Sequence, residues 1–153
     1  MERLERTYGA SPEEIWELWT TAEGIARWWA PDGFVVEVIE LDLRPGGELV
    51  YELIAVGPEQ VAFMESAGLP LRAVSRKTFT TVERPHRLGY RSLVDFVPGV
   101  EPYEHLTEIE LRADDGGTLV VMEMERLHDA DWTGRLLAGR SNELDNLEAA
   151  LSA

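Results

Sequence analysis

The feature that most constrains the fold is the apolar pattern of the last stretch, Asp129–Leu151. Apolar or small residues recur there at steps of three, four or five, which keep to one face of a helix with 3.6 residues per turn. They are Trp132, Leu136, Gly139, Leu144, Leu147 and Leu151. Asp129 or Asp131 can accept hydrogen bonds from the free N–H groups of the first turn. Most of the sequence between residues 34 and 128 predicts strands, so we expect a curved antiparallel sheet closing around one C-terminal helix.

The N-terminal part predicts one strand followed by two short helices. Leu4–Tyr8 is charged and short, which is typical of an edge strand. Ser11-Pro12-Glu13-Glu14 combines a serine cap, a proline in the first turn and a following glutamate, three signals of a helix start. A second start follows in Thr20–Glu23, and Pro31-Asp32-Gly33 ends the pair.

The central part predicts a run of strands interrupted once by a helix. The strands are Phe34–Leu43, Glu48–Val56, Val74–Glu83, Leu88–Phe96, Tyr103–Arg112 and a last one that carries Val120, Met122 and Met124. Asp114-Asp115-Gly116-Gly117 is a hairpin turn. Within Pro58–Pro70, Glu59–Glu65 has the pattern of a short amphipathic helix that stops at Gly68. The order predicts the α+β class in a single domain, 1–153.

Charge and composition exclude several classes of function. The net charge of −15 argues against binding to a nucleic-acid backbone or an anionic membrane, because both would repel the chain. Without cysteine there is no disulfide, thiolate nucleophile or zinc–thiolate site. The first residues lack the apolar run of a signal peptide, and no apolar stretch approaches membrane-spanning length. We therefore expect a cytoplasmic protein.

Four segments of the chain occur together, in this order, in one known family. They are Ser11-Pro12-Glu13-Glu14-Ile15-Trp16, Trp28-Trp29-Ala30-Pro31, Asp42-Leu43-Arg44-Pro45-Gly46-Gly47 and Gly117-Thr118. With them the chain resembles the SRPBCC (START-like) superfamily, and within it the bacterial proteins similar to the activator of heat-shock-protein-ninety ATPase. The resemblance implies a helix-grip fold, in which a seven-stranded antiparallel sheet holds the C-terminal helix around an apolar cavity. Many members carry Gly-Trp in the last helix, whereas this chain has Gly139-Arg140.

We expect the ligand-binding residues on the inner face of the sheet, on the last helix and around the cavity mouth. The predicted set is Trp28, Trp29, Tyr51, Phe63, Met64, Tyr90, Ser92, Tyr103, His105, Met122, Met124, Leu136 and Arg140. The loop Val97–Pro102 is expected at the mouth as well. His105 is either a base or hydrogen-bonding group for a ligand, or a buried structural histidine. Arg140 either binds an acidic or carbonyl-bearing ligand end, or pairs with a nearby carboxylate.

No metal or cofactor is expected. The three histidines lack the spacing of a metal site, and no nucleophile elbow, P-loop or dinucleotide signature is present. Glu108, Glu110, Glu123 and Glu125 alternate toward the outer face of the sheet, which favours solvated positions over catalytic carboxylates.

Three functions remain after these exclusions. The favoured one is non-enzymatic binding of an apolar or aromatic small molecule in the cavity. The second is a cofactor-independent enzyme of the cyclase or aromatase type that uses His105, Tyr103 or Arg140 to polarise a carbonyl. The third is a protein-interaction module like the chaperone activator. The sequence leaves both a monomer and a homodimer open.

Overall fold

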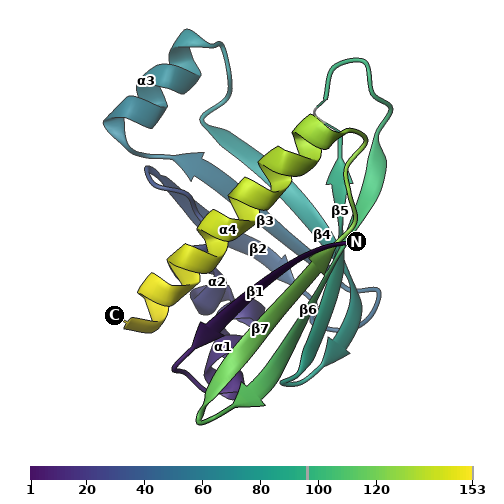
Figure 1. Ribbon diagram of the computed structural model, residues 1–153. Helices are drawn as coiled ribbons and strands as arrows, with labels where there is room; N and C mark the ends of the chain where they lie inside the picture. The colour runs from purple at the N-terminus through teal and green to yellow at the C-terminus, as the bar shows by residue number, and fades with distance from the viewer. Residues whose placement is uncertain (96, 153) are drawn as a thin grey trace.

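The computed structural model describes residues 1–95 and 97–152, which form seven strands and four helices. In chain order they are β1 (Glu2–Tyr8), α1 (Pro12–Thr20), α2 (Ala22–Trp28), β2 (Phe34–Leu41), β3 (Glu48–Ala55), α3 (Pro58–Ser66), β4 (Arg72–Glu83), β5 (Arg87–Val94), β6 (Tyr103–Asp114), β7 (Gly117–Met124) and α4 (Ala130–Ser152). Figure 1 shows α4 lying across the sheet.

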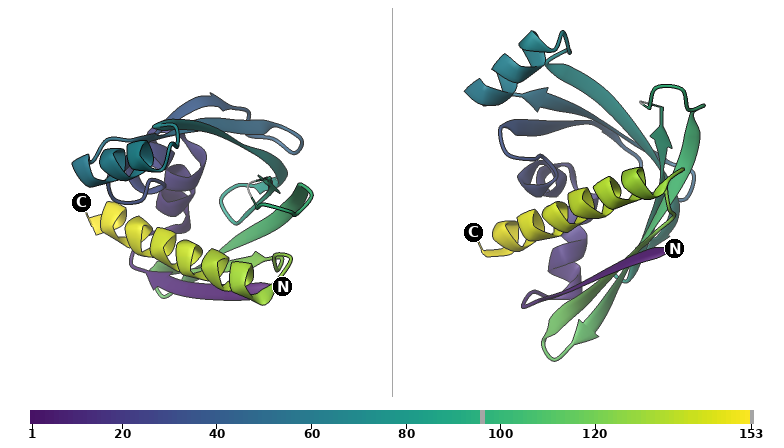
Figure 2. Two further views of the ribbon diagram at one scale, coloured as in Figure 1. Left: turned by 90° about the horizontal axis from the view of Figure 1, so that it is seen from above. Right: turned by 45° about the horizontal axis from the view of Figure 1, so that its top comes forward.

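All seven strands belong to one antiparallel sheet in the order β1-β7-β6-β5-β4-β3-β2. Strands β2 to β7 pair with their neighbours along the chain. The first strand, β1, pairs with the last, β7, so the two lie side by side at one edge of the sheet. The sheet curves around α4, as the view from above shows (Figure 2). This arrangement confirms the predicted α+β helix-grip fold.

Helix α4 is fixed to the sheet by apolar packing and by polar contacts at its C-terminal half. Leu144 and Leu147 are completely buried in the core. The Tyr8 hydroxyl of β1 donates a hydrogen bond to the Leu144 carbonyl at 2.7 Å, and Arg6 pairs with Asp145 at 2.6 Å. Of the two candidates for the helix cap, Asp129 and Asp131, it is Asp129 whose side chain accepts a hydrogen bond from the Trp132 N–H, at 2.7 Å.

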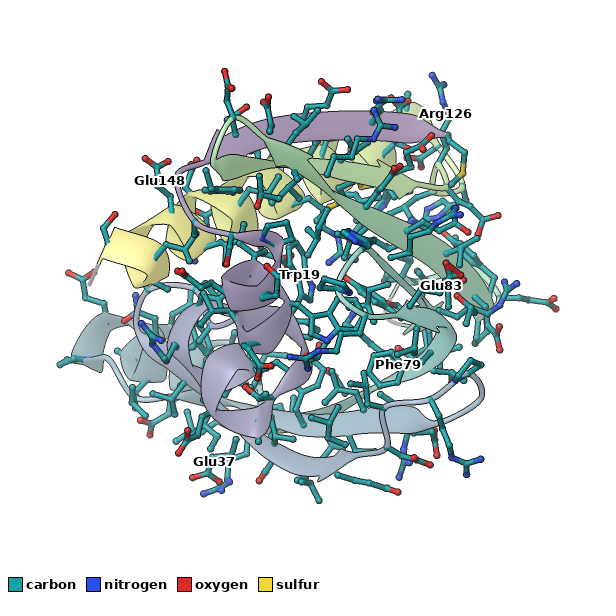
Figure 3. All side chains as sticks on the ribbon, turned by 90° about the horizontal axis from the view of Figure 1, so that it is seen from below. Trp19, Glu37, Phe79, Glu83, Arg126 and Glu148 are labelled. Carbon is teal, nitrogen blue, oxygen red and sulfur yellow. The ribbon has the colours of Figure 1, made fainter. Side chains whose placement is uncertain are left out.

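Helices α1 and α2 close one end of the curved sheet with tryptophan. Their caps are those predicted: the Ser11 and Thr21 hydroxyls accept hydrogen bonds from the N–H groups of residues 14 and 24. Trp19 and Trp28 are buried with their rings edge to face, 4.7 Å apart between centroids. Figure 3 places Trp19 in the interior, as it does Phe79 of β4, whereas Glu148 lies at the periphery.

The predicted boundaries of the strands agree with the structure to within two residues at the described positions. The strand predicted as Phe34–Leu43 ends at Leu41. The strand predicted as Leu88–Phe96 runs from Arg87 to Val94, and residue 96 lies outside the described residues, as does residue 153 of the predicted domain. The predicted hairpin turn is present with positive φ angles of 49° at Asp115 and 82° at Gly116, as a tight two-residue turn requires.

Two features lie at the margin of the sheet. Helix α3, predicted as Glu59–Glu65, buries none of its residues and projects beyond the strands (Figures 1 and 2). Strand β2 forms the outer edge next to β3, with a bulge between Val38 and Glu40 and with Val35 and Ile39 exposed.

The docking of α4 predicts where the chain is sensitive to substitution. Leu144→Ala should lower the free energy of unfolding by about 2–5 kcal/mol, because it leaves a cavity between helix and sheet. Asn142→Ala, at an exposed position of the same helix, should change it by no more than about 0.5 kcal/mol. Urea unfolding of the two variants measures both values. Equal effects would contradict the observed docking.

Candidate functional site

A cavity of about 680 Å³ lies between the N-terminal half of α4 and strands β3 to β6. Its lining residues are Tyr51, Val74, Ser75, Arg76, Lys77, Ser92, Leu93, Val94, Asp95, His105, Leu127, Arg135, Leu136, Gly139, Arg140 and Glu143. The half of α4 that carries Leu144 and Leu147 is packed against the core, so the hollow is confined to the other half.

Strand register aligns three polar side chains on the cavity wall. Lys77 of β4 lies opposite Ser92 of β5, and Ser92 lies opposite His105 of β6. Because partners across antiparallel strands point to the same face, the three form one row across the sheet. Tyr90 occupies the next inward position of β5 and is buried beneath this row.

Lys77 is a buried amine without a carboxylate partner. The residue is only 9% exposed, and its Nζ donates a hydrogen bond to the Ser92 hydroxyl at 2.8 Å. Nζ also lies over the rings of Tyr90 and Trp29, 5.1 and 5.6 Å from their centroids. Within residues 1–95 and 97–152, no ion pair includes Lys77. Burial, and secondarily the Arg140 charge, lower the pKa of Lys77 to about 7.

Arg140 is the second buried cation, on a residue 8% exposed. Its Nη1 pairs with the Glu143 carboxylate at 3.1 Å, and its Nη2 lies 3.4 Å from the Thr107 hydroxyl. Its Nε is buried with no hydrogen-bond partner in the described part of the chain. Although burial alone would lower it, Glu143 and Tyr90 hold the pKa of Arg140 above its ordinary value, so the guanidinium stays charged.

His105 is held as a neutral imidazole. The residue is 2% exposed, and its Nε2 lies 2.7 Å from the Glu125 carbonyl oxygen. A carbonyl only accepts, so Nε2 carries the proton and Nδ1 remains an acceptor. Burial lowers the pKa of His105, which favours this neutral form. On the opposite wall, burial and the Glu143 charge raise the pKa of Tyr51 to about 12, so its hydroxyl is protonated.

The interior of the cavity carries a positive charge in an acidic protein. Two buried cations, Lys77 and Arg140, share the lining with two carboxylates that are not buried, Glu143, whose side chain is 31% exposed, and the exposed Asp95. The other cations of the lining are exposed and pair elsewhere: Arg76 with Glu48 and Arg135 with Asp131. The cavity therefore suits a ligand with an anionic or strongly hydrogen-bond-accepting group.

The structure brings five of the sequence-predicted residues into the lining: Tyr51, Ser92, His105, Leu136 and Arg140. Trp29 and Tyr90 are not lining residues but contact Lys77 from below. For Arg140, the carboxylate pairing left open from the sequence is present through Glu143, although one nitrogen of the guanidinium remains free of partners within the described residues.

The other predicted residues lie away from the cavity, for three reasons. Trp28, Met122 and Met124 are buried in the core. Phe63, 64% exposed, and Met64 project with α3. The Tyr103 hydroxyl turns to His128 Nδ1 at 2.7 Å, at the end of β6. Among the described residues, none of the loop Val97–Pro102 belongs to the lining.

The set predicted from the sequence lacks Lys77, Glu143 and the small residue Gly139, all of which line the cavity. A signal for Lys77 was present, because it shares the inward parity of Phe79 in β4 and a lysine at such a position is unusual. Glu143 follows Arg140 by three positions, which places both on one side of the helix.

No group of three or more histidine and acidic side chains is placed to hold a metal ion in residues 1–95 and 97–152. None of the helices described is both long enough and apolar enough to cross a membrane.

Comparison with known proteins identifies the family and the fold. Residues 9–152 match the model of the family described as Activator of Hsp90 ATPase homolog 1-like protein. The solution structure of an AHSA1-like protein from Aeromonas hydrophila is similar, with a TM-score of 0.73 and 20% identity over 99% of this chain and 92% of that one. The crystal structure of a protein from Chromobacterium violaceum is also similar, with a TM-score of 0.72 and 23% identity over 97% of this chain and 94% of that one. No curated protein matches the sequence.

The buried amine predicts a pH-dependent stability. Between about pH 7 and the ordinary lysine pKa of 10.5, the unfolded chain binds a proton that the folded chain does not, so the free energy of unfolding rises with pH. Across this range, the free energy of unfolding of the wild type should increase by up to about 5 kcal/mol relative to that of Lys77→Met. Urea unfolding of both proteins at about pH 6 and about pH 10 measures the difference. A difference independent of pH would show that Lys77 keeps an ordinary pKa.

Proposed function

This chain belongs to the family of Activator of Hsp90 ATPase homolog 1-like proteins, and we propose that it binds a small molecule with an apolar or aromatic body and an anionic or carbonyl-bearing end. The ligand would lie between the sheet and α4, with its polar end toward Arg140 and Lys77. The helix-grip fold of the wider superfamily commonly binds hydrophobic ligands, which is consistent with this position.

The size and walls of the cavity support a small-molecule ligand. Its volume of about 680 Å³ lies within the range of roughly 300–1,000 Å³ typical of small-molecule sites. Leu127 and Leu136 offer apolar surface, and Gly139 leaves room beside the helix because an added Cβ there would meet nothing within 4 Å. A planar or aliphatic body would replace water against these groups.

The observation that carries the proposal is that the cavity has two buried cations and no buried carboxylate among its described lining residues. Arg140 is nine-tenths buried and still has an Nε without a partner in the described chain. Lys77 is equally buried and has only a serine hydroxyl as its hydrogen-bond partner there. An unpaired buried charge is costly, and a ligand oxygen at this end would offset that cost.

The same geometry weakens the two alternatives. A protein-interaction module needs no cavity between sheet and helix, whereas this chain has one that is partly open to solvent. An enzyme of the cyclase or aromatase type would lose Tyr103, which contacts His128 instead of the cavity, although His105 and Arg140 remain in place. We propose that the protein acts in the cytoplasm as a single domain, without nucleic acid, membrane or cofactor. The net charge of −15 supports the part of this proposal that concerns nucleic acid and anionic membranes.

The proposal predicts a preference for anions that depends on Arg140. Wild-type protein should bind 2-naphthoate at least about tenfold more tightly than the neutral 2-naphthalenemethanol, because a charge-assisted hydrogen bond contributes about 1.5–3 kcal/mol. Arg140→Leu should bring the two affinities close together. Isothermal titration calorimetry measures the dissociation constants.

Arg44→Leu is the matched control, since Arg44 is exposed, pairs with Asp42 and lies outside the cavity lining. It should keep the wild-type preference. Unchanged preference in Arg140→Leu would exclude Arg140 as the anion-binding group, and equal binding of both probes by the wild type would overturn the proposal. Native mass spectrometry of protein from its own host, searching for a co-purifying small molecule, would identify the ligand itself.

A further inference from the structure

Lys77 is the only lysine among the 153 residues, and every other side-chain cation except histidine is an arginine. Arginines also form the ion pairs on the surface, for example Arg72 with Glu52 and Arg112 with Glu110. Apart from histidine, the positively charged side chains that face water are therefore all guanidinium groups. Its one amine is placed on the inner face of β4, against the cavity.

The chemical difference between the two cations gives this placement a meaning. A guanidinium remains protonated in proteins and is a poor nucleophile, whereas a lysine loses its proton readily when buried and then carries a free electron pair. A charge needed only to bind an anion would be supplied equally well by arginine. A lysine at this position adds the capacity to form a covalent bond.

The surroundings of Nζ favour a reactive amine. Two aromatic rings, those of Trp29 and Tyr90, lie on it, and neither supplies a formal negative charge. The Arg140 guanidinium carbon lies 6.0 Å from the centroid of the same Tyr90 ring, so a second cation shares the site. Desolvation together with a neighbouring cation is the arrangement that activates amine nucleophiles. The Ser92 hydroxyl, which accepts from Nζ at 2.8 Å, keeps its own proton available for transfer.

We propose that Lys77 forms a reversible imine with a small aromatic aldehyde or ketone bound in the cavity. The Nζ electron pair attacks the carbonyl carbon, a C–N bond forms, and the C=O π electrons move to oxygen, which takes up a proton through Ser92. The carbinolamine then loses its oxygen as water: the C–O bond breaks, the nitrogen pair forms C=N, and both amine protons leave with the oxygen. The step consumes one amine and one carbonyl and releases one water.

The charged and titratable groups around Lys77 are consistent with an amine that exchanges between its protonated and neutral forms near pH 7. Burial and Arg140 of α4 lower its pKa to about 7, and Glu143 of α4 acts in the opposite direction. Across the sheet, Tyr51 of β3 and Tyr90 of β5 have raised pKa values and stay protonated, and the lowered pKa of His105 of β6 keeps it neutral. The amine is thus available at a pH where an exposed lysine is almost fully protonated.

This activity goes beyond the proposed binding function, and the two fail separately. Loss of 2-naphthoate binding in the wild type would overturn the binding proposal and leave imine formation to be judged by its own product. A wild type that binds 2-naphthoate but forms no adduct would overturn the imine alone.

The test uses the full chain, benzaldehyde and sodium cyanoborohydride, which reduces an imine to a stable benzylamine. Intact mass spectrometry counts the adducts, and peptide mapping separates Lys77 from the N-terminal amine, the other amine of the chain. At about pH 7, labelling of Lys77 in the folded protein should be at least about tenfold faster than in urea-unfolded protein, because unfolding returns the amine to its ordinary pKa. The rate should rise with pH and level off above about pH 7.

Lys77→Arg keeps the positive charge, so it controls for folding and for simple electrostatic attraction of the probe. It should lose the Lys77 adduct and retain only labelling at the N-terminus. Ser92→Ala provides a second variant, which should slow labelling while leaving Lys77 present. Labelling confined to the N-terminus in the wild type, or equal rates at Lys77 in the folded and unfolded chains, would overturn the proposal.

Discussion

The packing of α4 against the concave face of the sheet is the constraint on which the rest of the structure depends. One end of the helix carries Leu144, Leu147 and Ala150, all buried, and this contact excludes water from the core. The other end turns Leu136, Gly139 and Arg140 along the same side, where the strands do not close upon it. Leu136 and Leu137 of this end are only partly buried against the core, so the tightest apolar packing of α4 is at its C-terminal end. A single periodic face thereby produces both a stable core and a hollow.

The fold was accessible from the sequence because its signals are local. The serine cap before Pro12, the Asp115–Gly116 turn and the alternation of Tyr103–Arg112 each depend on neighbours along the chain. The site was accessible only in part, because it depends on which strands lie opposite one another. Strand alternation predicts that His105 faces inward, and helical spacing predicts the same for Arg140. The row formed by Lys77, Ser92 and His105 exists only once the register of three strands is fixed. Likewise, the direction in which α3 leaves the sheet decides that Phe63 faces away from the cavity, and no local pattern encodes that direction.

The sign of the charge differs between the surface of the molecule and its cavity. The chain as a whole is strongly acidic, with a net charge of −15, while its cavity carries two buried cations. Long-range repulsion slows the approach of anions, and its effect decreases as salt shortens the screening distance. Short-range attraction inside the hollow acts in a less polar medium and is screened less. The proposed preference for an anionic ligand would therefore be decided inside the cavity, by fit beside Arg140, rather than during diffusion to the surface.

The bulge in β2 has a consequence for how copies of the chain meet. An outermost strand exposes unpaired backbone groups on which another molecule could extend the sheet. Here the extra residue between Val38 and Glu40 breaks the regular spacing of these groups, and Glu37 and Glu40 add like charges along the same margin. If the β2 edges of two copies came together, their backbone hydrogen-bonding groups would not align and their carboxylates would repel each other. The exposed Val35 and Ile39 thus lie on a strand edge that disfavours pairing with a second copy, and concentrated salt would weaken only the electrostatic part of that effect.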